Sequence, residues 1–170
     1  MGVLIVVLGV VVLMAKQANA TPANSNLDAI YQDVAHQFGD DWRLAKAFAM
    51  KESSENPAAE NPNDPSYGLY GIQPFWLVSF GVLAKDDPEL QTKTKDLLTS
   101  DPRFATEMFF RILAYFRRRT NPLTLSAFKF PDEADIYNVG ETLWSKGVRN
   151  IAYKDFIVRE YAELSQVVDA

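Results

Sequence analysis

Hydrophobic residues recur every three to four positions along most of the chain after residue 26, which is the spacing of helices that bury one face. Residues that start or stop helices divide this pattern into segments. Gly39 ends one helix, and Asp40 or Asp41 can cap the next. Asp87-Pro88 and Asp101-Pro102 each predict the start of another, with the Asp as cap and the Pro as the first helical residue. We find no convincing alternation of the kind that predicts a strand. Helices are therefore expected at about residues 27–38, 42–53, 72–80, 88–99, 102–119, 131–137 and 153–168.

The segment 102–119 is expected to be the central buried helix, because its large hydrophobic residues share one face. Those residues are Phe104, Met108, Ile112 and Tyr115. Residues 54–67 contain three prolines and three asparagines and are expected to form a loop. A chain of 170 residues fits one domain better than two. The sequence therefore predicts an all-α single domain with a substrate cleft walled by loops.

The N-terminal segment carries an unbroken hydrophobic run from Val3 to Ala15. Because a membrane-spanning helix needs about 20 apolar residues, this run has the length of a secretory signal core. Ala18-Asn19-Ala20 follows, with small residues at the positions that a signal peptidase reads. No Lys or Arg precedes the run, however, and Lys16 follows it, which suits an uncleaved anchor. The expected division is a signal peptide or membrane anchor at 1–20, a short linker at 21–26 and a folded domain at 27–170.

The composition excludes several kinds of site. The chain has no cysteine and one histidine, so a disulfide framework, a cysteine nucleophile and a multi-histidine metal site are impossible. No Gly-x-Ser-x-Gly motif accompanies His36, which is expected to have a structural or surface role. The net charge of -5 disfavours a nucleic-acid partner, and the basic run Arg117 to Arg119 is typical of the solvated last turn of a helix. We expect no metal and no cofactor.

One charged residue, Glu52, falls on the apolar face of the helix expected at 42–53. On a helical wheel with about 100° per residue, Glu52 lies between Ala45 and Phe48. An unpaired carboxyl placed there loses hydration, which raises its pKa and keeps it protonated near neutral pH. A glycosidase general acid needs this state because it must protonate the leaving oxygen. Periodicity alone leaves open that Glu52, at a helix end, turns out to solvent.

The segment around and after Glu52 resembles a known family. Residues 47–57 read Ala-Phe-Ala-Met-Lys-Glu-Ser-Ser-Glu-Asn-Pro, and residues 68–73 read Gly-Leu-Tyr-Gly-Ile-Gln. They resemble the first two motifs of the lytic transglycosylases, which share the lysozyme-like fold: a helix ending in Glu-Ser, a loop with Asn-Pro, then Gly-Leu-Met-Gln-Ile. Residues 136–140, Ile-Tyr-Asn-Val-Gly, are similar to the family's Ala-Tyr-Asn-Ala-Gly. Tyr153 begins the helix that stands where the family has its closing helix.

The resemblance spans about residues 42–160, with departures in the second motif. Tyr70 stands where the family has Met, and Gly71 stands where it has Gln. Gln73 lies two residues later and is a candidate to supply the missing amide to the cleft. Residues 81–101 match no part of the pattern. These departures leave the catalytic assignment intact and put the substrate contacts in doubt.

The resemblance implies an enzyme that cleaves the β-1,4 bond between N-acetylmuramic acid and N-acetylglucosamine in peptidoglycan glycan strands. Glu52 would protonate the glycosidic oxygen and then act as base on the sugar's own 6-hydroxyl, which closes a 1,6-anhydro ring without water. Most glycosidases use two carboxylates. The best second candidate here, Asp64, has the surroundings of a turn residue, and the intramolecular attack needs no second carboxylate.

The resemblance also implies substrate contacts. Tyr137 is expected to donate a hydrogen bond to the Glu52 carboxylate or to a sugar, and Tyr70 and Trp76 could stack on sugar faces. Trp42 and Trp144 are expected in the core. The full set of expected contacts is Ser53, Gly68, Tyr70, Gln73, Tyr137 and Asn138.

Two alternatives remain open. A hydrolase of the goose-lysozyme type would use the same fold and the same Glu, and a membrane-tethered scaffold would keep the shape without the chemistry. Export would place the domain in the periplasm or cell envelope, with membrane contact through residues 3–15 if that segment is uncleaved. Besides glycan strands, an envelope-spanning or virion assembly is an expected partner, because short enzymes of this kind serve phage entry, lysis, conjugation, secretion and wall turnover.

Overall fold

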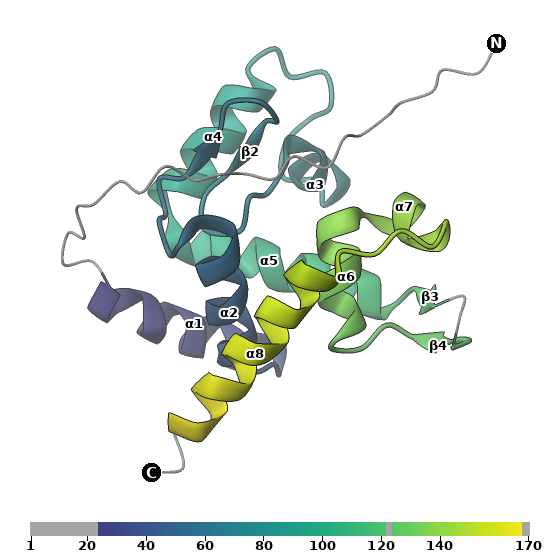
Figure 1. Ribbon diagram of the computed structural model, residues 1–170. Coiled ribbons are helices and arrows are strands. Elements are labelled where there is room, and N and C mark those ends of the chain that lie inside the picture. The colour runs from purple at the N-terminus through teal and green to yellow at the C-terminus, as the bar shows by residue number, and fades with distance from the viewer. Residues whose placement is uncertain (1–23, 122–123, 168–170) are drawn as a thin grey trace.

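The computed structural model describes residues 24–121 and 124–167, which form helices joined by loops and turns, with two hairpins of two-residue strands (Figure 1). The helices are α1 (Asn24–Phe38), α2 (Trp42–Ser53), α3 (Pro74–Ser79), α4 (Leu90–Ser100), α5 (Pro102–Arg117), α6 (Asp132–Val139), α7 (Glu141–Ser145) and α8 (Ile151–Val167). The antiparallel pairs are β1 (Glu60–Asn61) with β2 (Ser66–Tyr67), and β3 (Thr120–Asn121) with β4 (Ser126–Ala127). The prediction of an all-α class is confirmed, and the two small hairpins are additions that the pattern did not indicate.

The N-terminal segment expected to be a signal peptide or an anchor lies outside the described residues. Within the two described stretches, no helix is long and apolar enough to cross a membrane. Helix α1 begins at Asn24, inside the stretch 21–26 that was expected to be a linker. The first helix therefore begins three residues earlier than the hydrophobic pattern predicts, at Asn24 instead of about Leu27.

Aspartates begin two helices as the sequence predicts. The carboxylates of Asp41 and Asp101 each accept a hydrogen bond at 3.0 Å from a backbone N–H of the first turn of α2 and α5. The same prediction fails at Asp87, whose carboxylate accepts from a backbone N–H within a turn while α4 begins later, at Leu90. Helix α7 is also unforeseen, because five residues are too few to show a hydrophobic repeat.

Helix α5 is the central helix, as predicted, and α1, α4 and α6 all pack against it. Met108 and Ile112 are fully buried, whereas Phe104 and Tyr115 lie at the edge of the core and are partly buried. In Figure 1 the β1–β2 hairpin, α3 and α4 lie on one side of α5, and α1, α2 and α8 lie on the other. Helix α2 packs between α1 and α8, and α8 also packs against α6.

A cluster of aromatic rings joins α5 to the elements on both sides of it. Phe109 of α5 stacks on Tyr70 with ring centroids 4.5 Å apart, and it contacts Phe48 of α2 at 4.9 Å and Tyr137 of α6 at 5.7 Å. Burial of each such side chain contributes roughly 1.5–3 kcal/mol. Because these rings come from α2, α6 and the loop after β2, their packing fixes the relative positions of three segments that line the cleft described below.

An ion-pair network ties the turn between α1 and α2 to the core. Arg117, in the last turn of α5, donates to Asp40 in that turn and to Glu133 of α6, the latter at 2.5 Å. Glu133 is almost completely buried and Asp40 largely so. The prediction that the basic run is solvated is therefore wrong for Arg117, because two carboxylates from distant parts of the chain surround it. It is right for Arg119, which is exposed and lies 3.1 Å from Glu141.

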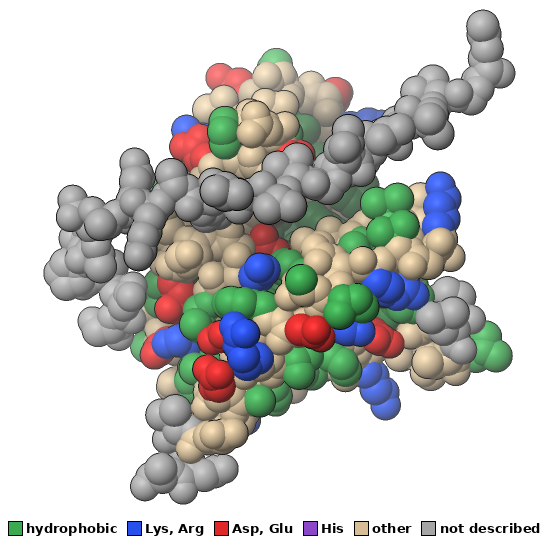
Figure 2. Space-filling model, viewed as in Figure 1, with side chains coloured by type: hydrophobic (Ala, Val, Ile, Leu, Met, Phe, Trp, Pro, Cys, Tyr) green, Lys and Arg blue, Asp and Glu red, His purple; other side chains and the backbone are tan. Residues whose placement is uncertain are grey.

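Charged side chains of both signs are interspersed over the face shown in Figure 2. On α8, for example, Arg159 lies 2.8 Å from Glu160 and 3.9 Å from Glu163. Exposed pairs of this kind are worth at most about 1 kcal/mol each, so they contribute to solubility more than to stability. His36 is exposed near the end of α1, as predicted.

Candidate active site

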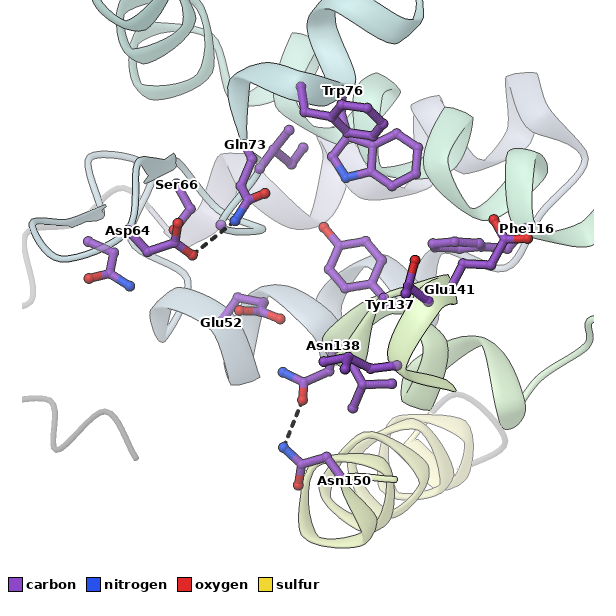
Figure 3. A pocket seen from close by; sticks show the side chains of 18 of the residues that line it. Glu52, Asp64, Ser66, Gln73, Trp76, Phe116, Tyr137, Asn138, Glu141 and Asn150 are labelled. Carbon is purple, nitrogen blue, oxygen red and sulfur yellow. Dashed lines mark hydrogen bonds between the residues drawn. The ribbon is translucent and has the colours of Figure 1, made fainter. Parts of the chain in front are cut away.

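A cleft of about 910 Å³ is lined by elements from both sides of α5. This volume is in the range of ligand-binding clefts, roughly 300–1,000 Å³. One wall comes from the β1–β2 hairpin, the loop after it and α3. The other comes from the end of α2, from α6, α7 and the residue before α8, and the end of α5 lies between the two walls (Figure 3). The lining side chains that the sequence singled out are Glu52, Asp64, Gln73, Trp76, Tyr137 and Asn138.

Glu52 reaches the cleft from the last turn of α2 (Figure 3). The helix ends directly afterwards, because Ser54 has a left-handed backbone and its N–H bonds back to carbonyls of the last turn. The Tyr153 hydroxyl donates a hydrogen bond to Glu52 Oε1 at 2.5 Å. On the other side the backbone of Gly71 comes so close that a Cβ at this position would lie 3.3 Å from Glu52 Oε2. The carboxyl is thus held between α8 and the loop after β2.

Burial raises the pKa of the Glu52 carboxyl from 4.5 to about 7, against the opposing effects of the Tyr153 hydrogen bond and the nearby Lys51 ammonium group. Near neutral pH, Glu52 is therefore present in both its protonated and its ionised form. Such a group can both donate and accept a proton at this pH, as a general acid/base must. Glu52 is half-buried and faces the cleft, and it does not turn out to the open surface, which is the alternative that periodicity left open.

Two tyrosines lie beside this carboxyl, and Tyr153 is the one that bonds to it. Tyr137 lines the cleft, but its hydroxyl donates to the backbone carbonyl of Tyr70 at 2.9 Å. The predicted hydrogen bond from the Tyr137 hydroxyl to the Glu52 carboxylate is therefore wrong, because α6 directs that hydroxyl toward the loop after β2. A sugar, the other predicted partner of Tyr137, stays a prediction. Burial, and then the proximity of Glu52, raise the pKa of both tyrosine hydroxyls well above the usual value, so both remain donors.

Amide side chains lie on both walls of the cleft (Figure 3). Gln73 donates from Nε2 to Asp64 Oδ2 at 2.9 Å, and on the other wall Asn138 Oδ1 accepts from Asn150 Nδ2 at 2.7 Å. Gln73 and Asn138 thus line the cleft and are exposed to it, in the place where sequence reasoning expected them. Asp64 also lines the cleft, although its sequence surroundings are those of a turn. Asn150 was missed, because no motif marks it.

Three of the expected substrate contacts lie behind the cleft instead of lining it. Ser53 is buried, and its hydroxyl donates to a carbonyl of α2 at 3.1 Å. Gly68 packs against α4, where a Cβ would lie 2.4 Å from the Leu98 carbonyl oxygen. The Tyr70 side chain is fully buried and its hydroxyl bonds to Thr106 at 3.1 Å. The expectation of direct sugar contact is therefore wrong for the fully buried Tyr70 side chain. Ser53 holds the end of α2, one of the roles expected for it, and Gly68 lies outside the cleft lining, so all three residues support the cleft wall.

A network beneath the cleft rim fixes Asn150. The buried Asp135 carboxylate accepts a hydrogen bond from the Asn150 backbone N–H at 2.8 Å and lies 3.2 Å from Arg149 Nε. The Arg149 guanidinium lies 3.7 Å from the centroid of a Trp144 ring. Trp144 is a core residue, as predicted, while Trp42 packs against the core and is partly buried. The network orders the loop between α7 and α8, and with it the amide that Asn150 presents to Asn138.

Among residues 24–121 and 124–167, no group of three or more acidic or histidine side chains is arranged to hold a metal ion. The sequence matches no protein-family model and no curated protein.

Proposed function

We propose that this chain is a peptidoglycan lytic transglycosylase with a lysozyme-like fold, in which Glu52 is the single general acid/base. The observation that supports it most strongly is a desolvated carboxyl, with its pKa raised to about 7, at the wall of a cleft of about 910 Å³. Two other described carboxyl groups line this cleft, those of Asp64 and Glu141, and both residues are exposed. Of these three described residues, Glu52 is the one that is half-buried.

In the first step, protonated Glu52 donates its proton to the glycosidic oxygen, and the bond from that oxygen to the anomeric carbon breaks. The N-acetyl group of the sugar assists the positive charge at the anomeric carbon. In the second step, the Glu52 carboxylate accepts the proton of the 6-hydroxyl while that oxygen bonds to the anomeric carbon. The 1,6-anhydro ring closes, Glu52 is protonated again, and no water is consumed.

The contacts of Glu52 suit both steps. The Tyr153 hydroxyl occupies Oε1 and stabilises the carboxylate form that exists between the two proton transfers. Because Gly71 has no side chain, nothing from this position covers Oε2, which is left to exchange the proton with substrate. Gln73 and Asn138, on opposite walls, present amides that can bond to hydroxyl and acetamido groups of a glycan strand.

A hydrolase of the goose-lysozyme type is the second candidate, and the position of Asp64 is the observation that favours it. Its carboxylate lines the same cleft and is oriented by the Gln73 amide at 2.9 Å. A second carboxylate in such a place could activate a water molecule. Replacement of Asp64 with Asn separates the two reactions: a transglycosylase keeps most of its activity, whereas a hydrolase that needs this base loses it.

The test of the catalytic assignment is clearing of purified cell wall by the wild type, Glu52→Gln and the matched control Glu55→Gln. Glu55 lies three residues further on, is half-buried and also has its pKa raised by burial, but it does not line the cleft. We expect Glu52→Gln to lose at least about 100-fold in rate and Glu55→Gln to keep its rate. Equal clearing by all three proteins refutes the role of Glu52. A wild type that clears no wall, beside an active lysozyme standard, supports the inactive scaffold instead.

A further inference from the structure

Asn150 lies at the cleft immediately before α8, and its side chain bonds in two directions. Its Oδ1 accepts a hydrogen bond at 3.1 Å from the backbone N–H of Tyr153, in the first turn of α8. Its Nδ2 donates at 2.7 Å to Asn138 Oδ1, on α6. One side chain thus joins the helix that carries Tyr153 to an amide that lines the cleft (Figure 3).

The backbone of Asn150 is anchored from below. Its N–H donates at 2.8 Å to one carboxylate oxygen of Asp135, a residue with no exposed surface. Arg149, the preceding residue, lies 3.2 Å from the other oxygen of this carboxylate and donates to the Trp144 carbonyl at 2.6 Å. Because the backbone cannot follow, rotation of the Asn150 amide would break both of its side-chain bonds.

The direction of these bonds follows from the Tyr153 N–H, which can only donate. It requires an acceptor, so the atom of Asn150 that faces α8 is Oδ1 and the atom that faces α6 is Nδ2. This Nδ2 in turn requires the acceptor of Asn138, which is Oδ1. Asn138 Nδ2 bonds to no other residue in 24–121 or 124–167, and in Figure 3 it lies on the side of the amide away from Asn150. A backbone N–H therefore determines that the cleft meets a donor at Asn138.

A capping role alone does not call for asparagine at this position. Asn, Asp and Ser stabilise a helix start about equally well, because each offers a side-chain oxygen to the first turn. In this chain aspartates cap α2 and α5. Asparagine differs from the other two in its Nδ2 donors, which Asp and Ser lack at neutral pH in this direction. The bond to Asn138 is thus the contribution that is specific to asparagine.

We propose that Asn150 is a positioning residue, which holds the Asn138 amide with its donor toward the ligand. The group that this arrangement selects is an acceptor oxygen, such as the carbonyl of an acetamido group on a glycan strand. This inference rests on the proposed function and extends it to specificity, because a sugar with a free amine in place of the acetamido group offers no carbonyl to this donor.

The test compares Asn150→Ser with Asn150→Asp, which both keep a capping oxygen. In Asn150→Ser the Asn138 amide is free to rotate. In Asn150→Asp it is reversed, because the introduced carboxylate accepts from Asn138 Nδ2 and leaves Oδ1 toward the ligand. Calorimetry with an N-acetylglucosamine hexamer, in the Glu52→Gln background, should give an affinity about fivefold weaker for Asn150→Ser and at least about tenfold weaker for Asn150→Asp. Equal affinities of the parent and both variants overturn the proposal, as does a parent that does not bind the hexamer.

A double-mutant cycle with Asn138→Ala separates positioning from a general structural effect. If Asn150 acts through the Asn138 amide, Asn150→Ser has no further effect on hexamer affinity once that amide has been removed. The same fivefold loss in the Asn138→Ala background contradicts the proposal, because a displaced cleft wall weakens binding whether or not the amide is present.

Two further readouts are insensitive to a positioning role and sensitive to damage. A glucosamine hexamer has no acetamido carbonyl, so its affinity should be the same for the parent and Asn150→Ser; a matching loss for both hexamers refutes selection of an acceptor. With Glu52 intact, Asn150→Ser should keep the alkaline limit of wall clearing, since the cap keeps Tyr153 at the Glu52 carboxyl. A shifted limit shows that the acid has been disturbed and contradicts a role exerted through Asn138.

Failure of the positioning role can be distinguished from failure of the enzyme. If wild type clears cell wall and Glu52→Gln does not, while the Asn150 variants bind the hexamer as the parent does, the positioning role is wrong and the proposed function stands. If the variants bind in the predicted order but wild type clears no wall, the positioning role stands and the proposed function is wrong.

Discussion

Replacement of Glu52 with Gln should make the fold more stable than the wild type at alkaline pH. Gln keeps the shape of the side chain but cannot ionise. In the wild type the pKa of Glu52 is about 7 in the folded state, against 4.5 for an unperturbed carboxyl. Between these two values the folded protein binds more protons than the unfolded chain. The stabilising effect is therefore fully present below pH 4.5 and is lost as the pH rises to about 7.

The magnitude follows from the shift. One pKa unit corresponds to about 1.4 kcal/mol, so a change from 4.5 to about 7 corresponds to at most about 3.4 kcal/mol. Between about pH 5 and about pH 8, the free energy of unfolding of the wild type should fall by about 2–3 kcal/mol relative to that of Glu52→Gln. The Tyr153 hydroxyl can still donate to the amide oxygen of Gln, and any change in that bond adds an offset that does not vary with pH.

Urea unfolding of both proteins at four or five pH values measures this difference. Glu163→Gln, a change on the exposed side of α8, serves as the control and should follow the wild-type curve. Curves for wild type and Glu52→Gln that run parallel across the whole range would refute the reasoning, because a carboxyl with an ordinary pKa contributes no slope in this window.

Further predictions concern the surroundings of the acid and the core. Tyr153→Phe removes a bond that lowers the pKa of Glu52, so the alkaline limit of wall clearing should move to higher pH; an unchanged limit contradicts this. Gly71→Ala puts a Cβ 3.3 Å from Glu52 Oε2, so the initial rate of wall clearing should fall by at least about tenfold. Because the backbone φ at this position is +57°, the same change should lower the free energy of unfolding in urea by about 1 kcal/mol. Arg117→Met leaves two largely buried carboxylates without their partner and should lower the free energy of unfolding by about 3 kcal/mol. The control Arg118→Met changes an exposed neighbour and should lower it by less than about 0.5 kcal/mol in the same assay.

The place of Glu52 at the cleft could be predicted from the sequence, because a charge that interrupts an apolar helix face is a local signal. Glu52 needs only the residues of its own helix to be noticed. Its hydrogen-bond partner could not be found in the same way, since Tyr153 lies 101 residues away and the resemblance favoured Tyr137. Periodicity shows which face of a helix is buried, but it does not show which side chain of another helix meets that face.

The sequence predictions that failed most clearly concern residues whose side chains suit both the core and the surface. Tyr70 is an aromatic residue in a loop and could stack on a sugar or fill the core; the position of Phe109 decides for the core. Arg117 belongs to a basic run whose pattern predicts exposure to solvent, but Asp40 and Glu133 surround it in the folded chain. In both cases the deciding partner is distant in sequence, so composition and spacing could not reveal it.

The most direct test of the central claim is mass spectrometry of the fragments that wild type and Glu52→Gln release from purified peptidoglycan. We predict fragments with 1,6-anhydro ends, lighter by one water than hydrolysis products, from the wild type and none from Glu52→Gln. Fragments with only reducing ends, or anhydro fragments released equally fast by Glu52→Gln, would contradict the assignment.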